Sequence, residues 1–190
     1  MIRTSLPTLR LIIALLLAGA CVPSLHPLYT DADLFLDRRL IGRWVGVEDS
    51  RTPATWRFER SGDDGYTLTH TAEGKTARFN AHLVRLRDYV FLDIQPRQEP
   101  GKLNEVLEAH LVGAHTFSRI WVEDNQVRMA SLDEDWLKRM LREKKFLLSH
   151  EIIDGRMLLT ASTPTLQRFA IRYAEDTLAF AHTQEWRRKK

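Results

Sequence analysis

The chain has a single cysteine among its 190 residues, Cys21, so no disulfide can form within it. It also lacks a long hydrophobic run, since its longest apolar stretch covers the twelve residues 11–22. Twelve residues reach about 18 Å as a helix, whereas about 20 residues are needed to cross the hydrocarbon core of a bilayer. These absences exclude a disulfide-bonded scaffold and argue against a membrane-spanning helix in this stretch.

Clustered positive charge is missing from most of the sequence. Residues 21–184 contain 22 basic and 24 acidic side chains, a net charge of −2, and four further basic residues occupy 187–190. A nucleic-acid-binding surface requires clustered basic charge on the fold itself, so no nucleic acid is expected as a partner. We interpret residues 183–190 as a solvated basic tail. The alternative is weak attraction to anionic lipid, with Trp186 at the membrane interface.

The features that are present begin at the N-terminus. Two arginines precede the apolar residues 11–17, and three small residues, 18–20, follow. This order of basic, apolar and small residues is typical of a secretory signal peptide, the alternative being a buried N-terminal core helix. The sequence therefore predicts that residues 1–20 are cleaved from the mature protein.

Cys21 follows directly on these small residues. The segment Leu17-Ala18-Gly19-Ala20-Cys21 resembles the lipobox of bacterial lipoproteins. The resemblance implies that Cys21 is acylated and anchors the mature chain to a membrane, which also removes a free thiol from an oxidising compartment. Val22 stands where enteric-type lipoproteins of the inner membrane carry aspartate, so the resemblance implies the outer membrane, with the fold facing the periplasm.

The mature chain starts with an aperiodic segment. Residues 22–33 contain two prolines and follow neither the helical nor the strand pattern, so residues 21–36 are predicted to be a tether between the lipid and the fold. A single domain is predicted over residues 37–182, because 44% hydrophobic and 28% charged side chains are typical of one packed globular unit.

From residue 40 onward apolar residues recur with a period of two. Trp56 and Phe58 share one face of a predicted strand, and after a turn at 61–65 the next strand alternates in the same way. Further alternating segments cover residues 76–86, 88–96, 108–123 and 127–131. The first of these loses its phase at Val84, which predicts a bulge.

The period changes to that of a helix at two places. Residues 132–141 carry one apolar stripe, with Ser131 as the expected N-cap and Glu134 completing a capping box. A second amphipathic helix begins at Pro164, behind Thr163 as its N-cap. A hairpin through residues 154–155 lies between the two helices.

About eight to ten short strands at hairpin spacing predict a mostly β protein. We expect an antiparallel up-and-down β-barrel rather than a sandwich, because closure removes unpaired strand edges. One inserted helix and one C-terminal helix accompany the barrel.

The segment Leu40-Ile41-Gly42-Arg43-Trp44 lies at the first predicted strand. It resembles the Gly-x-Trp signature of lipocalins and related calycin barrels, in which the tryptophan packs across one barrel end and a C-terminal helix lies outside. The resemblance implies a lipocalin-like barrel with structural roles for Gly42 and Trp44. Segments at 56–66 and 91–93 also resemble a group of small uncharacterised bacterial lipoproteins, which implies no known activity.

Motifs for catalysis and metal binding are missing from the sequence. The segment 150–154 approaches a zinc-protease signature, but Asp154 stands in place of the second histidine and the segment is a predicted strand. His110 and His115 would point to opposite faces of an extended chain. No Gly-x-Ser-x-Gly elbow exists. We therefore expect no catalytic residue, no metal site and no cofactor, and hence no enzyme.

These features favour a lipid-anchored envelope protein whose barrel binds a small apolar or amphipathic ligand. The alternative is a filled barrel that docks a protein partner through its outer face or its helices, and the sequence identifies no such partner. The two hypotheses differ in the barrel interior. A cavity of about 300 Å³ or more favours the ligand.

Overall fold

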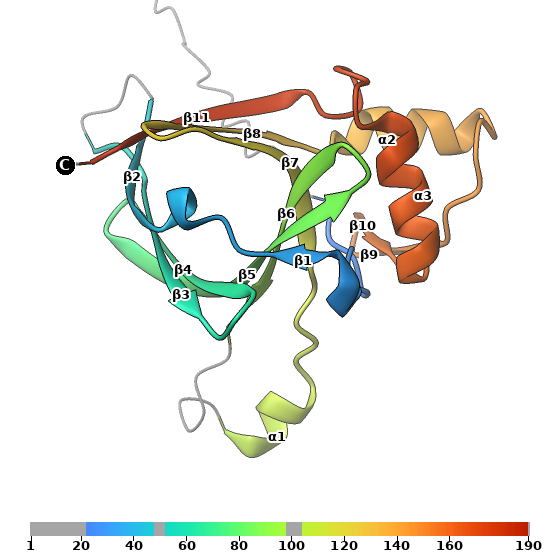
Figure 1. Cartoon of the computed structure of the whole chain (residues 1–190). Coiled ribbons are helices and arrows are strands. Elements are labelled where there is room, and N and C mark those ends of the chain that lie inside the picture. The colour runs from blue at the N-terminus through green and yellow to red at the C-terminus, as the bar shows by residue number, and fades with distance from the viewer. Residues whose placement is uncertain (1–21, 48–51, 98–103, 190) are drawn as a thin grey trace, which may run out of the picture.

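The computed structural model describes residues 22–47, 52–97 and 104–189. Eight antiparallel strands close into a barrel in which successive strands pair and the last strand returns beside the first (Figure 1). The barrel strands are β2 (Gly42–Gly46), β3 (Thr55–Ser61), β4 (Gly65–Ala72), β5 (Lys75–Leu86), β6 (Tyr89–Pro96), β7 (Thr116–Val122), β8 (Gln126–Ser131) and β11 (His182–Arg188). The predicted mostly β, up-and-down barrel is confirmed.

Between β8 and β11 the chain leaves the barrel and builds a layer against its outer wall. This layer contains α2 (Glu134–Arg142), β9 (His150–Ile153), β10 (Arg156–Leu159) and α3 (Thr163–Tyr173). The hairpin β9–β10 forms a separate two-stranded sheet. The second predicted helix is α3, and one more strand, β11, follows it. A short helix, α1 (Glu105–Ala109), precedes β7, and no helix in the described ranges is long and apolar enough to cross a bilayer.

Alternation along the strands divides the apolar side chains between two cores. Trp56 and Phe58 point into the barrel as predicted, whereas Val84 and Phe91 point outward and pack under the helical layer. Val84 lies opposite Phe91 in an unbroken register, so the predicted bulge is wrong. The change of phase at Val84 arises because β5 is buried on both faces there.

The N-terminal segment lies on the outer wall of the barrel. Val22 and Leu28 are 3% and 0% exposed, and the short strand β1 (Leu34–Phe35) pairs with β5. Two short 3-10 helices, η1 (Asp31–Asp33) and η2 (Arg38–Leu40), flank β1. The prediction of a tether is therefore wrong for residues 22–36. Their apolar side chains are aperiodic in sequence because they contact a curved surface rather than one face of a regular element.

The predicted basic tail is also wrong for its described residues. Residues up to Arg188 belong to β11, which hydrogen-bonds to β8 on one side and to β2 on the other. Trp186 is 3% exposed and points into the barrel, so it does not lie at a membrane interface. The boundary predicted at residue 182 cuts off the strand that closes the barrel.

One end of the barrel is closed by Trp44. The ring is fully buried, and its Nε1–H donates to the carbonyl of Leu40, 2.8 Å away, in η2. Gly42 has φ +139°, a conformation that side chains disfavour, and a Cβ there would lie 2.5 Å from Nη1 of Arg188. The Gly-x-Trp segment therefore occupies a position that requires both residue types.

Candidate functional site

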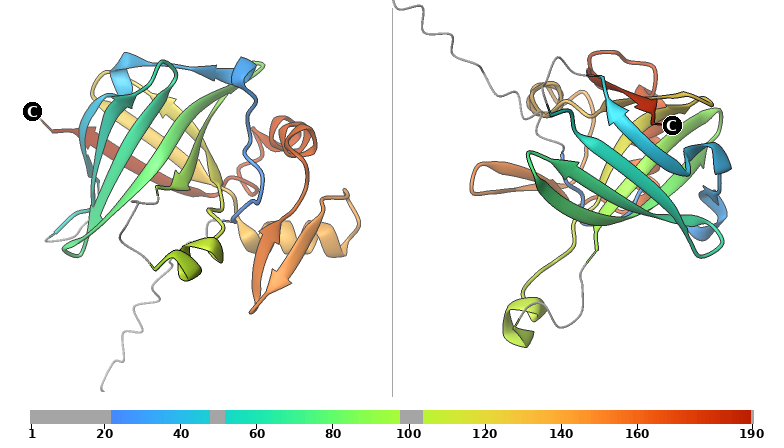
Figure 2. Two further views of the ribbon diagram at one scale, coloured as in Figure 1. Left: turned by 90° about the horizontal axis from the view of Figure 1, so that it is seen from below. Right: turned by 90° about the vertical axis from the view of Figure 1, so that its left-hand side faces the viewer.

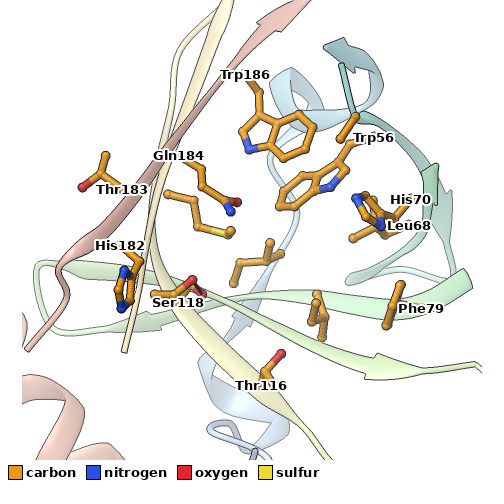
Figure 3. Close-up of a pocket in the computed structure, with 15 residues that line it drawn as sticks. Trp56, Leu68, His70, Phe79, Thr116, Ser118, His182, Thr183, Gln184 and Trp186 are labelled. Carbon is orange, nitrogen blue, oxygen red and sulfur yellow. Dashed lines mark hydrogen bonds between the residues drawn. The ribbon is translucent and has the colours of Figure 1, made fainter. Parts of the chain in front are cut away.

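The end of the barrel opposite Trp44 opens into a cavity of about 420 Å³ (Figure 3). Its lining comes from β3 to β8 and from β11, together with Ala54. Neighbouring strands alternate their direction, so residues near the end of one strand and the start of the next meet at the same end. The cavity is therefore built from segments spread over about 130 residues of sequence.

One wall of the cavity is apolar. It is formed by the inward side chains of β3 to β6, among them Trp56, Leu68, Phe79 and Leu92. These residues are the inward half of the alternating pattern seen in the sequence. The wall can bury an apolar group by exclusion of water, at about 25 cal/mol per Å².

The opposite wall is polar and lies on β7, β8 and β11. Ser131 is the register partner of both Ser118 and His182, so these three side chains occupy adjacent strands. The two serine Oγ atoms are 3.1 Å apart, and Nε2 of His182 is 2.9 Å from Oδ2 of Asp133. Asp133 also caps α2, which couples this wall to the helical layer. The described lining residues include no Asp, Glu, Lys or Arg.

Two stacked indoles line the cavity. The ring centroids of Trp56 and Trp186 are 4.2 Å apart, with an interplanar angle of 24°. His70 contacts the edge of Trp56, at a centroid distance of 6.4 Å. The Nε1–H of Trp186 is buried and has no hydrogen-bond partner among the described residues. This unsatisfied donor is unusual for a buried polar group in a folded protein.

A second polar cluster lies outside the barrel, beneath the N-terminal segment. Asp93 is 1% exposed, and it accepts from the backbone N–H of Leu28 (2.9 Å) and contacts Nδ1 of His115 (2.7 Å). The ring of Tyr29 lies 4.7 Å from that of His82. Burial raises the pKa of Tyr29 to about 12 and lowers the pKa of His82. The cluster holds residues 22–29 against the wall rather than lining a cavity.

The residues singled out from the sequence lie in three places. Cys21 is outside the described residues. Gly42 and Trp44 are at the closed end, away from the cavity. His110 and His115 are the two ends of the segment between α1 and β7. Nδ1 of His110 contacts the carbonyl of Val106, and Nδ1 of His115 contacts Asp93. The described residues contain no cluster of three or more potential metal ligands.

Sequence reasoning missed the contribution of β11 to the cavity. His182, Gln184 and Trp186 line it, whereas the predicted domain ends at residue 182 and the predicted tail begins at residue 183. Their spacing of two residues is the signal of a strand. It is weak because only one of the three side chains is large and apolar.

Comparison of the chain with protein-family models, with curated proteins and with solved structures finds no match.

Proposed function

We propose that this chain is a lipid-anchored protein of the cell envelope that binds one small amphipathic molecule inside its barrel. The observation that carries the proposal is the cavity of about 420 Å³. Its volume falls within the range of about 300–1,000 Å³ typical of small-molecule sites. A filled barrel that serves only to dock a protein would have no need of this space.

The two walls suggest how the ligand is oriented. Its apolar part would lie against Trp56 and Phe79, and its polar part would face Thr116, Ser118 and His182. The absence of Lys and Arg from the described lining favours a head group recognised by hydrogen bonds over one that carries several negative charges.

The anchor in this proposal is Cys21, acylated before residues 1–20 are removed, with the protein in the outer membrane and the barrel in the periplasm. The proposal is for binding rather than catalysis. In the cavity, the Ser118 hydroxyl contacts that of Ser131 and His182 contacts Asp133, so these groups hold one another and orient hydrogen bonds for a ligand. The proposal requires no metal and no cofactor.

Two measurements on residues 22–190 test ligand binding. Protein purified from its native envelope is extracted with organic solvent, and we expect mass spectrometry to find a small amphiphile at about one per barrel. In the second measurement, fatty acids and monoacyl lipids are titrated against tryptophan fluorescence. Saturable quenching is expected because Trp56 and Trp186 line the cavity.

A matched pair of variants assigns the signal. Trp186→Phe should remove much of the fluorescence change, while Trp121→Phe should retain it, because Trp121 contacts the core outside the barrel. An empty extract together with a failure of acyl lipids, isoprenoids and haem to saturate would reject the ligand. Cross-linking in intact envelopes would then test the protein-docking alternative.

A further inference from the structure

Exposed apolar side chains lie on three segments at the mouth-side end of the molecule: the loop after β2, the segment between β6 and β7, and the β9–β10 hairpin. We define the mouth collar as Val47, Val106, Leu107, Val112, Ile152 and Ile153, whose exposed fractions run from 46% to 72%. In the left view of Figure 2 the mouth faces down, and the yellow-green α1 and the tip of the orange β9–β10 hairpin lie at the lower edge. Large exposed apolar patches mark interaction surfaces.

The closed end differs in character. Its turns carry charged and polar residues at 62–64, 87–88 and 123–125, and none of the large exposed apolar side chains among the described residues lies in them. The contrast makes the two ends of the barrel chemically distinct. The large exposed apolar side chains among the described residues are therefore absent from the turns of the closed end.

The N-terminal segment joins the fold at the same end as the collar. Ser24 exchanges backbone hydrogen bonds with His115, directly before β7, and Leu25 donates to Leu159 at the end of β10. Val22 is already 3% exposed. Cys21 directly precedes Val22 in the sequence.

We infer that the mouth collar rests on the bilayer to which Cys21 is anchored, so that an amphiphile passes between the membrane and the cavity without crossing water. This inference depends on the acylation of Cys21 in the proposed function. Because Cys21 directly precedes the packed Val22, a lipid on Cys21 would keep the mouth end of the fold close to the bilayer. Apolar side chains at an interface insert about 5–10 Å into the boundary between head groups and acyl chains.

The test uses the full-length mature protein, isolated with its lipid and reconstituted into phosphatidylethanolamine–phosphatidylglycerol vesicles. Leu107→Cys or Val112→Cys carries an environment-sensitive fluorophore, and Asp63→Cys, in the β3–β4 turn at the closed end, is the matched control. The acylated Cys21 offers no competing thiol. All three positions are exposed, so the thermal unfolding of each variant should match that of the parent.

Nitroxide-labelled lipids in the same vesicles should quench the two collar labels about threefold or more over the Asp63 label, as expected for insertion to the acyl boundary. Equal quenching of the collar labels and the Asp63 label in an acylated protein would overturn the proposed orientation on the bilayer. It would not contradict the proposal that the barrel binds a ligand. A benzophenone at Leu107 that cross-links an envelope protein, with no lipid quenching, would assign the collar to a protein partner and also overturn it. A mature chain without an acyl group would reject the anchor and this inference together.

Discussion

The guanidinium of Arg188 lies over the indole of Trp44, 4.3 Å from the ring centroid, at the closed end of the barrel. It also donates hydrogen bonds to the carbonyls of Asp124 (2.6 Å), Ile41 (3.0 Å) and Arg39. These carbonyls belong to the β7–β8 turn and to the segment that enters β2. One side chain therefore joins the first and last barrel strands to a turn between them.

Removal of the ring beneath this arginine should be costly. We expect Trp44→Ala to lower the free energy of unfolding by about 3–5 kcal/mol, the usual loss for a large buried aromatic side chain. Urea denaturation measures the change. Arg187→Ala is the control, because Arg187 is an exposed neighbour on β11, and its midpoint should stay close to that of the parent. A Trp44→Ala protein with the parent's midpoint would show that the ring does not close the barrel.

Gly42→Ala tests the same end from the backbone. A Cβ would clash with Nη1 of Arg188, and the φ of +139° is strained for alanine, so we expect a loss of about 1–3 kcal/mol. Gly62→Ala is the comparison, because its φ is also positive but a Cβ there meets nothing within 4 Å. Gly62→Ala should lower the free energy of unfolding less than Gly42→Ala does. A larger loss for Gly62→Ala would contradict the close approach of Arg188 to Gly42.

Truncation after Ala181 distinguishes a strand from a tail. Without β11, the edges of β2 and β8 are unpaired and the cavity loses one wall, so we expect no cooperative unfolding transition and strong aggregation. Circular dichroism and gel filtration report both effects. The substitution Lys189→Ala controls for the loss of basic charge and should fold normally. A truncated chain that unfolds like the parent would mean that β11 is dispensable.

Thr116→Val removes one hydroxyl from the polar wall without changing the volume of the side chain much. If the hydroxyl binds the head group of the ligand, the affinity should fall by about 0.5–1.5 kcal/mol, or about two- to tenfold. Thr69→Val is the matched control, since Thr69 alternates with Leu68 and points outward on β4. Fluorescence titration of both proteins compares them. Equal affinities would remove Thr116 from the site.

The unfolding free energy should depend on pH through His82. Burial disfavours the imidazolium and lowers the pKa of His82, and the nearby Asp93 offsets this in part. The unfolded chain, with a histidine pKa of about 6.5, therefore takes up the proton first, and the free energy of unfolding should fall as the pH drops below about 6.5. His82→Gln should reduce this loss of unfolding free energy at acidic pH. His26→Gln, at an exposed position, should leave the loss unchanged. Thermal unfolding between pH 5 and 8 gives the comparison.

Cys21→Ser tests the anchor. We expect the variant to lose all incorporation of labelled fatty acid and to accumulate as uncleaved precursor, because the chain has no other thiol for acylation. Autoradiography and membrane fractionation follow both outcomes, with Ser24→Ala as a control that keeps the thiol. If the serine variant incorporated as much labelled fatty acid as the parent, acylation of Cys21 would be rejected.

The sequence by itself determined the strands with strong alternation. Trp56, Phe58 and Leu68 share a face in the linear pattern, and they share the barrel interior in the structure. The turns between these strands and the presence of α2 and α3 also follow from local chemistry, although the N-caps are Asp133 and Ser162 rather than the predicted Ser131 and Thr163. Such features depend on neighbours a few residues apart, so they are readable without the fold.

Tertiary structure alone decided the role of β11 and of residues 22–36. β11 carries mostly polar side chains around Trp186, and it becomes a strand because two open edges, on β2 and β8, pair with it from both sides. The N-terminal segment is ordered by the outer wall, through partners such as Asp93 and His115 that lie far away in sequence. The cavity also depends on the tertiary structure. Its volume is the space left between side chains from seven strands, and no local sequence pattern determines that space.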